Sequence, residues 1–508
     1  MKTRNRFTKA VALALSVTML TAGAAFAQGD GELRVRARSG EDIDTMDPAF
    51  YLGNEEFNVD LAIYSKLVSY LPDSAEVELD AAESLEISDD GTVIEFELKE
   101  GIQFHHDYGE MTAEDVKFSF ERFLDEDNPS PYASDWATLE EVEVTGTYTG
   151  RIILSEPFAP LLSSTLPWSP GSIISKEAYE DRGERFALDP VGSGPYYWSD
   201  WNPNQELVLE RFDDYYGEQP DFSRIVIVPV LDPQIAEFSF DAGELDATEV
   251  SLDSIARYED DPDVTVDILA GLRYHFLGIN VEEEPFDDIR VREAVRYAVN
   301  IDEILAGAYN GVPERANTML APSILGYWED APEYQQDLER ARELLAEAGY
   351  PDGFSTTITT DNIPQHQQGA AIVQQQLQQV GIDAEIDLVN VLYDALSAGP
   401  AGLHYAAFSG VLDPGYWFEW FTCDQVGAWN YWQWCNEEFD SLKEEAAQIT
   451  DPDERAERYI RMQEVIDEDI PVVWITNGAN VYVYRTAEID PAFLAMYAQY
   501  TYWKDLRD

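Results

Sequence analysis

The sequence predicts an α/β protein built from more than one domain, and two observations lead to this. The chain has 508 residues, whereas one compact domain usually takes roughly 100–200. From about residue 272 onward, strand-like and helix-like segments alternate, which is typical of α/β lobes. With 45% hydrophobic residues, the chain has enough apolar surface to pack such lobes.

In the first half, Val93–Leu98 alternates with period two and predicts a strand. Thr112 and Asp115 form a variant capping box, which predicts a helix with positions 116, 120, 123 and 124 on one face. Further strands are expected at Arg151–Leu154 and Ile225–Val230, with a chain breaker at Gly192–Pro195.

The second half supplies the alternating pattern. Strands are expected at Tyr274–Ile279, Ala384–Val389 and Val472–Thr476. Helices are expected at Ile289–Ala308, Asp337–Ala348, Gly369–Val380, 437–447 and 453–468. A last strand, Val481–Tyr484, is too short to found a domain, so we expect it to return to the first part of the fold.

The first 27 residues have the features of a secretory signal peptide. Basic residues precede a short apolar run, Ala10–Leu20, and Ala25-Phe26-Ala27 fits an A-x-A cleavage site. The run is shorter than the ~20 residues that a membrane span needs. We therefore expect a soluble protein, cleaved after Ala27 and located in the periplasm.

The charge is extremely negative. The chain carries −67 at pH 7, and removal of the signal peptide with its four cations gives −71. Such a charge excludes binding to nucleic acid and to anionic membranes. The acids are scattered along the chain, which fits a surface hydrated in high salt and predicts a halophilic or marine source.

No motif indicates a cofactor, a metal or catalysis. Gly192-Ser193-Gly194 lacks the rest of a nucleotide-binding loop, and Pro195 has no N–H for a phosphate. His105 and His106 point to opposite faces of an extended segment. The motifs of serine hydrolases and zinc proteases are absent. A secreted glycoside hydrolase stays a remote alternative, because 99 acids produce carboxylate pairs by chance.

Residues 413–435 concentrate aromatic side chains, with five of the 12 tryptophans. Polar residues are interleaved with them, which favours a ligand cleft over a dry core. Cys423 and Cys435, the only two cysteines, are expected to form a disulfide in an oxidising compartment, with two buried free thiols as the alternative. The disulfide would stabilise the fold by roughly 3 kcal/mol and keep the loop rigid.

Several segments together resemble one family. They are Asp47-Pro48, Ile63-Tyr64 with Leu67-Val68, Phe104-His105 through Thr112–Ser119, Val191–Tyr196, Asn280 through Pro285-Phe286 and Val291–Val295, and Asn436 through Phe439-Asp440. In this order they resemble the extracellular solute-binding proteins of family 5, the dipeptide- and oligopeptide-binding components of ABC importers.

The resemblance implies a two-lobed periplasmic-binding-protein fold with a hinge and an extra subdomain on the first lobe. We assign residues 31–50, 186–270 and 478–508 to lobe 1, 51–185 to its subdomain and 271–477 to lobe 2. The resemblance also implies a monomer that captures a solute and delivers it to membrane permease subunits, without catalysis or a cofactor.

One departure concerns the ligand. Peptide-binding members of the family carry an Asp three residues before a D/E-P pair, where it binds the ligand's ammonium. Here the pair is Asp413-Pro414, and Gly410 stands at the position of that acid. A peptide remains the first choice of ligand, with an opine, an amino-acid conjugate or an oligosaccharide as alternatives.

The expected ligand-binding residues form one wall of an interlobe cleft plus contacts from the hinge and the first lobe. The wall comprises Ser409, Gly410, Asp413, Tyr416, Trp417, Trp429, Asn430 and Trp434, and the other contacts are Tyr274, Ser193 and Tyr51. Asp413 is expected to meet a ligand cation, and the aromatics to provide apolar and cation–π surface.

Overall fold

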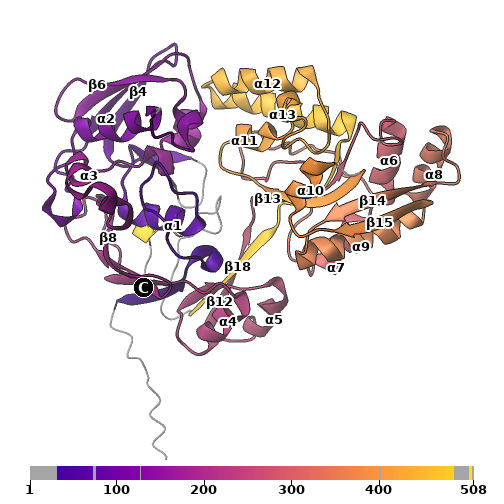
Figure 1. Cartoon of the computed structure of the whole chain (residues 1–508), viewed down its shortest axis with the longest axis horizontal. Coiled ribbons are helices and arrows are strands. Elements are labelled where there is room, and N and C mark those ends of the chain that lie inside the picture. The colour runs from indigo at the N-terminus through magenta and orange to yellow at the C-terminus, as the bar shows by residue number, and fades with distance from the viewer. Residues whose placement is uncertain are drawn as a thin grey trace, which may run out of the picture.

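The computed structural model describes residues 31–71, 76–125, 127–399, 402–485, 501 and 503–505. The predicted signal peptide, residues 1–27, lies outside this range. Figure 1 shows two bodies, one carrying α1 to α5 and the other α6 to α13, with β13 and β18 running between them.

The first lobe is built on a seven-stranded sheet in the order β12-β18-β11-β1-β10-β9-β8. Its strands are β1 (Glu32–Arg36), β8 (Tyr196–Asn202), β9 (Glu206–Arg211), β10 (Arg224–Val228), β11 (Ala247–Glu249), β12 (Val264–Ala270) and β18 (Ala479–Arg485). The helices α4 (Pro233–Asp241) and α5 (Ile255–Tyr258) share a buried cluster with β18. Pairing of β18 with β11 and β12 confirms that the last predicted strand returns to this lobe.

The segment expected to form the subdomain of the first lobe carries a four-stranded antiparallel sheet in the order β4-β5-β7-β6. Its elements are β2 (Val68–Tyr70), β3 (Val77–Leu79), β4 (Ala82–Ile87), β5 (Val93–Leu98), β6 (Leu139–Val144), β7 (Thr149–Leu154), α1 (Asn54–Ile63), α2 (Ala113–Glu121) and α3 (Lys176–Arg182). The capping box of Thr112 and Asp115 is confirmed at the start of α2. Leu124 does not share the buried face of that helix, because α2 ends at Glu121 and Leu124 is 38% exposed.

The second lobe is built on a five-stranded sheet in the order β15-β14-β16-β13-β17. The strands are β13 (Arg273–Ile279), β14 (Phe354–Thr360), β15 (Ile382–Leu388), β16 (Leu403–Ser409) and β17 (Val472–Thr476). The helices are α6 (Ile289–Ala298), α7 (Ile301–Ala308), α8 (Leu338–Glu347), α9 (Pro364–Gln378), α10 (Leu392–Ala398), α11 (Pro414–Glu419), α12 (Glu437–Gln448) and α13 (Pro452–Asp469).

The single helix predicted over Ile289–Ala308 is wrong, because α6 and α7 replace it. Val299 leaves the helical conformation, and Asn300 then caps α7 by accepting a hydrogen bond from the Glu303 backbone N–H at 3.1 Å. Asparagine is among the strongest N-cap residues, and its polar side chain marks a new helix start within an otherwise continuous apolar pattern.

In the part of the chain that the structure describes, two segments cross between the two lobes. β12 leads into β13 through Gly271 and Leu272, and β17 leads into β18 through Asn477 and Gly478. The crossings are adjacent, since the Gly271 N–H donates to the Gly478 carbonyl at 3.1 Å. A Cβ at Gly271 would lie 2.6 Å from the Asn477 carbonyl oxygen, so the close approach requires glycine. Two short crossing segments of this kind form a hinge.

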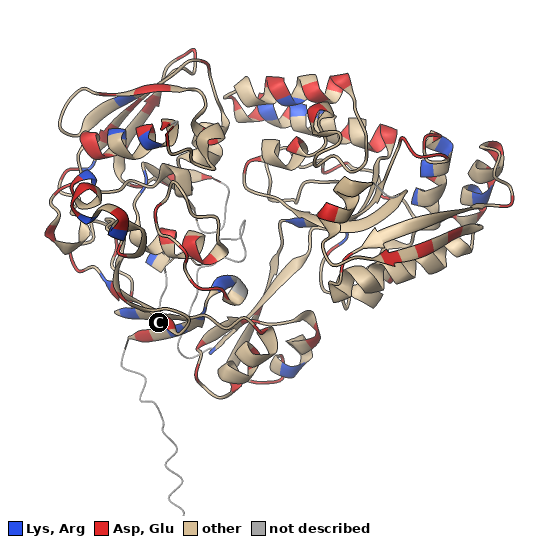
Figure 2. Ribbon diagram, in the orientation of Figure 1, with Lys and Arg blue, Asp and Glu red and all other residues tan. Residues whose placement is uncertain are grey.

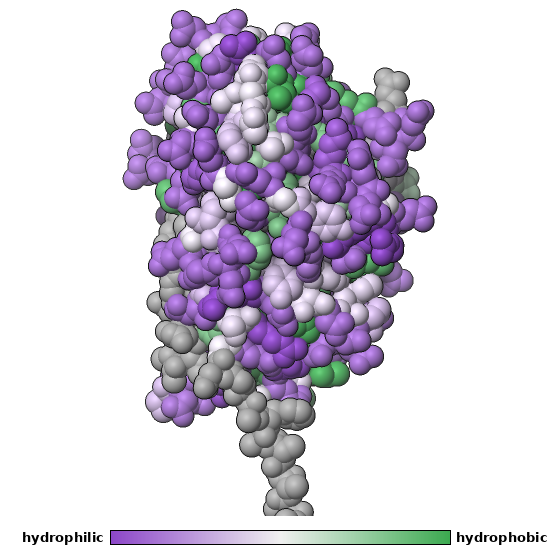
Figure 3. Space-filling model, turned by 90° about the vertical axis from the view of Figure 1, so that its left-hand side faces the viewer, coloured by the Kyte–Doolittle hydropathy of each residue, from purple (hydrophilic) through white to green (hydrophobic). Residues whose placement is uncertain are grey.

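Acidic side chains are spread over both lobes rather than gathered in one patch (Figure 2). The face of the molecule seen in Figure 3 is largely hydrophilic, with small and separate hydrophobic areas. Such a surface fits hydration in concentrated salt, and the halophilic source stays a prediction. Within the described ranges, no helix has both the length and the apolar character needed to cross a membrane.

Candidate ligand-binding site

Polar side chains gather where the parallel strands of the second-lobe sheet end. Asn362 follows β14, Asn390 follows β15, and Ser409 is the last residue of β16. β13 is antiparallel to β16, so its first residue, Arg273, pairs with Ser409. The strand order places these four residues, which we call the polar edge, along one side of the sheet. Open α/β sheets bind ligands at the carboxyl ends of their parallel strands.

The two asparagines of the polar edge hold each other, with Asn362 Nδ2 donating to Asn390 Oδ1 at 3.0 Å. Next to Asn362, Asp361 accepts a hydrogen bond from His366 Nδ1 at 2.9 Å. Burial raises the pKa of Asp361, but the His366 hydrogen bond and the charges of His366 and Arg273 outweigh burial, so its pKa is lowered overall. The lowered pKa favours the carboxylate form of Asp361. Its negative charge is partly balanced by these neighbours and lies within electrostatic reach of Arg273.

Aromatic rings continue this edge. The ring centroids of Tyr416 and Trp420 are 5.3 Å apart, those of Trp420 and Trp429 are 5.4 Å apart, and those of Trp429 and Tyr393 are 6.0 Å apart. We call these four residues the aromatic ladder. Tyr393 also stacks on Phe408 of β16 at 5.4 Å, which joins the ladder to the polar edge. Tyr416 and Trp429 are each 44% exposed, so they offer ring surface to a ligand.

The structure corrects the expectation that Asp413 meets a ligand cation. Its carboxylate is 3% exposed and forms an ion pair with Arg455 Nη2 at 2.8 Å. Ser163 of the subdomain donates its hydroxyl hydrogen to Asp413 Oδ2 at 2.6 Å, and Asp413 also caps α11 by accepting from the Gly415 N–H at 2.8 Å. We call Ser163, Asp413 and Arg455 the interlobe bridge, because Ser163 lies in the first lobe and the other two lie in the second.

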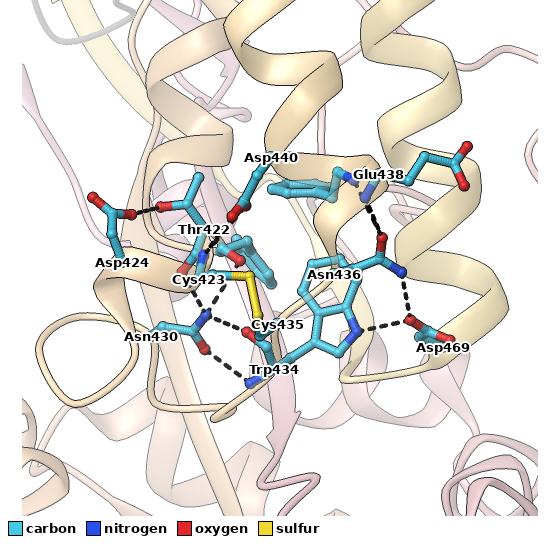
Figure 4. The surroundings of a disulfide bond; sticks show 12 residues. Thr422, Cys423, Asp424, Asn430, Trp434, Cys435, Asn436, Glu438, Asp440 and Asp469 are labelled. Atoms are coloured by element: carbon cyan, nitrogen blue, oxygen red, sulfur yellow. Dashed lines mark hydrogen bonds between the residues drawn. A yellow bond between two sulfur atoms is a disulfide. The ribbon is translucent and has the colours of Figure 1, made fainter.

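Cys423 and Cys435 form the predicted disulfide, and the loop that it closes is held from within (Figure 4). Asn430, predicted to bind ligand, is fully buried. Its Nδ2 donates to the backbone carbonyls of Phe421, Thr422 and Trp434 at 3.2, 3.1 and 2.7 Å. The amide therefore satisfies the loop backbone instead of facing the solvent.

Four more of the predicted wall and hinge residues belong to the core. Trp434 is 3% exposed, and its Nε1 donates to Asp469 Oδ2 at 2.9 Å (Figure 4). Trp417 is fully buried and stacks on the buried Tyr274 with ring centroids 5.1 Å apart. A Cβ at Gly410 would lie 2.0 Å from the Trp417 ring. The indole thus occupies the space that a side chain at position 410 would need.

The two first-lobe candidates are also buried. Tyr51 is 1% exposed, and its hydroxyl donates to Asp60 Oδ1 at 2.7 Å. Ser193 is fully buried and donates to Ser65 Oγ at 2.9 Å. Both side chains form these hydrogen bonds with partners inside the first lobe. Leu52, directly after Tyr51, is the side chain exposed at this point, at 68%.

The subdomain contributes an acid that the sequence analysis missed. Asp135 lies in the short turn Ala133–Trp136, and no described residue forms an ion pair with it. Burial raises the pKa of Asp135 to about 6, against a smaller opposing effect of the Ser134 hydroxyl. Burial, followed by the charges of Asp135 and Glu419, raises the pKa of the Tyr416 hydroxyl. Asp135 of the first lobe therefore lies near the second-lobe aromatic ladder.

Three predicted residues, Ser409, Tyr416 and Trp429, are exposed and belong to the polar edge or the aromatic ladder. Arg273 and Asn390 were not among the predicted residues, although each lies next to an end of a predicted strand. The strand β14 was not predicted either, and Asn362 was therefore not considered. Within the described residues, no group of three or more His, Cys, Asp or Glu is placed to hold a metal ion.

Comparison with known proteins gives the family. The model for bacterial extracellular solute-binding proteins, family 5 Middle, matches residues 76–428. The chain belongs to this family. A dipeptide-binding protein of Escherichia coli (strain K12) is 29% identical over 82% of this chain and 84% of its own length.

Two solved structures are similar along nearly the whole chain. HbpA2 from Haemophilus parasuis has a TM-score of 0.84 at 25% identity and covers 94% of this chain and 99% of its own. The ABC transporter-associated periplasmic binding protein DppA from Helicobacter pylori, in complex with the peptide STSA, has a TM-score of 0.74 at 27% identity and covers 93% and 97%. These structures confirm the predicted two-lobed α/β periplasmic-binding-protein fold.

Proposed function

We propose that this chain is the periplasmic solute-capturing component of an ABC importer, and that it binds a small solute, in the first place a peptide, between its two lobes. Membership of the family supports the proposal. It is also supported by similarity to a dipeptide-binding protein and to a periplasmic binding protein whose structure holds a peptide. The observation that carries it is the combination of exposed aromatic rings with polar strand ends on one wall.

Capture would proceed by hinge closure. A solute that contacts both lobes favours the closed arrangement by the difference between its affinities for the two states. The interlobe bridge suits such a motion, because Asp413 and Arg455 both belong to the second lobe. Opening would break the contacts of Ser163 with these two residues but would keep the ion pair. The motion therefore leaves no buried charge without its partner.

The remaining parts of the proposal concern partners and location. The protein is exported and cleaved after Ala27, and it works in the periplasm as a monomer. The loaded form delivers its solute to permease subunits in the inner membrane. The solute leaves chemically unchanged, since the family consists of solute-binding proteins. No cofactor takes part.

A second class of solute is favoured by one observation. Gly410 has no side chain, and the charge of Asp413 is taken by Arg455, so these two positions offer no acid to a ligand ammonium. An opine, an amino-acid conjugate or an oligosaccharide would not require that contact.

A thermal-shift screen of the mature protein in molar salt tests the proposal. A solute that binds only the folded state raises the unfolding free energy by about 2.7 kcal/mol at 100 times its Kd. We expect a shift with peptides or with the alternative solutes, reduced in Trp429→Ala and kept in Phe238→Ala. Phe238 is the matched control, because it is an aromatic residue 63% exposed on α4 of the first lobe. If no solute shifts the wild-type transition, the proposed function is wrong.

A further inference from the structure

Arg273 forms no direct ion pair among the described residues, although the chain is crowded with acids and Asp361 lies within electrostatic reach. Acidic residues outnumber lysines and arginines 99 to 32, so an arginine side chain meets carboxylates readily. Arg273 is exposed at the first position of β13. Its guanidinium forms no hydrogen bond and no ion pair with any residue that the structure describes. Its donors are therefore available to a solute.

The neighbour of Arg273 across the sheet is also available. In the register of β13 and β16, Arg273 lies opposite Ser409, and both side chains are exposed. Residues paired in this way point to the same face, with Cβ atoms about 4.5–5.5 Å apart. The Ser409 hydroxyl has no partner among the described residues. Together the two residues offer a charged fork and a hydroxyl at the hinge end of the polar edge.

We propose that Arg273, assisted by Ser409, binds a carboxylate of the transported solute while the apolar part of the solute lies on the aromatic ladder. This inference rests on the proposed function and defines its substrate class as monocarboxylate-bearing solutes. It makes Arg273 a specificity-determining residue.

Geometry and charge select a carboxylate. The planar guanidinium matches the two oxygens of a carboxylate with parallel hydrogen bonds. Asp361 lies within electrostatic reach of Arg273, and its negative charge disfavours an anion that carries a double charge, such as a phosphate monoester. The positive charge of Arg273 beside the Asp361 carboxylate therefore favours a solute group that carries one negative charge.

The same wall offers little to a ligand ammonium. Asp413 is paired with Arg455, and Asp361 is hydrogen-bonded by His366. Gly410 has no side chain. The second lobe therefore recognises the acid end of the solute, and any positive group of the solute must lie elsewhere.

The test pairs each peptide with its C-terminal amide, in which an uncharged group replaces the carboxylate. Di- to pentapeptides, their C-terminal amides, and neutral sugar oligomers are screened by thermal shift, and every hit is titrated by calorimetry. The titrations use the wild type, Arg273→Gln, Arg273→Lys and Arg342→Gln. Arg342 on α8 is the matched control, because its replacement removes the same charge from an exposed helix position whose side chain donates to the Gln379 carbonyl. Circular dichroism checks that each variant is folded.

We expect only free acids to bind. Arg273→Gln should weaken their binding about 10- to 100-fold, the loss typical of a charge-assisted hydrogen bond. The affinity of Arg273→Lys for free acids should lie between those of the wild type and the glutamine variant. The affinity of Arg342→Gln should stay within about twofold of the wild type, because salt screens a remote charge. Hits among amides or neutral sugars, or equal affinity in folded Arg273→Gln, would overturn this inference and leave the proposed function standing. A screen with no hit at all would overturn both.

Discussion

Asp135 stays in the fold at a cost in stability, and replacement by asparagine should remove that cost. Burial raises the pKa of Asp135 from 3.8 to about 6. The difference corresponds to about 3 kcal/mol against the ionised form in the folded state. Asparagine has nearly the same size and stays neutral at every pH. Asp135→Asn should therefore be more stable than the wild type at pH 7, by up to about 3 kcal/mol.

The sign of the pH dependence follows from the raised pKa. Below about pH 4 the carboxyl group is protonated in both the folded and the unfolded chain, so the variant gains nothing. Between about pH 4 and 6 the unfolded chain releases the proton first, and the wild type loses stability relative to the variant. Above about pH 6 the difference is constant at its full value.

Urea unfolding of both proteins at pH 4, 5, 6 and 7, followed by tryptophan fluorescence, measures this difference. Glu141→Gln on β6 is the matched control, because it removes an exposed acid and should change stability little at any pH. If Asp135→Asn gains no stability at pH 7, or gains the same amount at every pH, Asp135 is not the desolvated acid described above. An acid retained at such a cost is typical of functional sites.

Two further substitutions test how much the Asp413–Arg455 ion pair and the disulfide stabilise the fold. Arg455→Leu leaves Asp413 buried without its cation and should lower the free energy of unfolding by about 3–5 kcal/mol. A denaturant midpoint like that of the wild type would show that the interlobe bridge adds no stability. Cys435→Ser opens the disulfide and should lower the free energy of unfolding by about 3 kcal/mol. This difference should vanish when the wild type is measured in a reductant, and its persistence would mean that the serine itself disturbs the loop.

Local elements were predicted well because their signals are local. The strands Val93–Leu98 and Val472–Thr476 have the predicted bounds, and the capping box at Thr112 begins α2. Periodic polarity and cap residues act over a few positions, so they can be read from the chain alone. The break between α6 and α7 was missed because the apolar pattern continues across Asn300.

The candidate site was predicted as a region and not as a set of residues. Tyr416 and Trp417 are neighbours in the aromatic segment, yet Tyr416 is 44% exposed and Trp417 is fully buried. Composition cannot separate them, because their environment depends on how α11 packs against β13. The isolation of Arg273 and the burial of Asp135 also arise from tertiary packing, so neither has a signature in the sequence.

Native mass spectrometry of the mature protein, incubated with the mixed acids, amides and sugars, shows directly whether the cleft captures a solute and leaves it intact. We expect a one-to-one complex with a carboxylate-bearing solute, whose mass is unchanged when it is released. Release of a cleaved or altered solute would contradict a transport role. A folded protein that binds none of the acids would contradict the claim that the polar edge and the aromatic ladder bind a carboxylate-bearing solute.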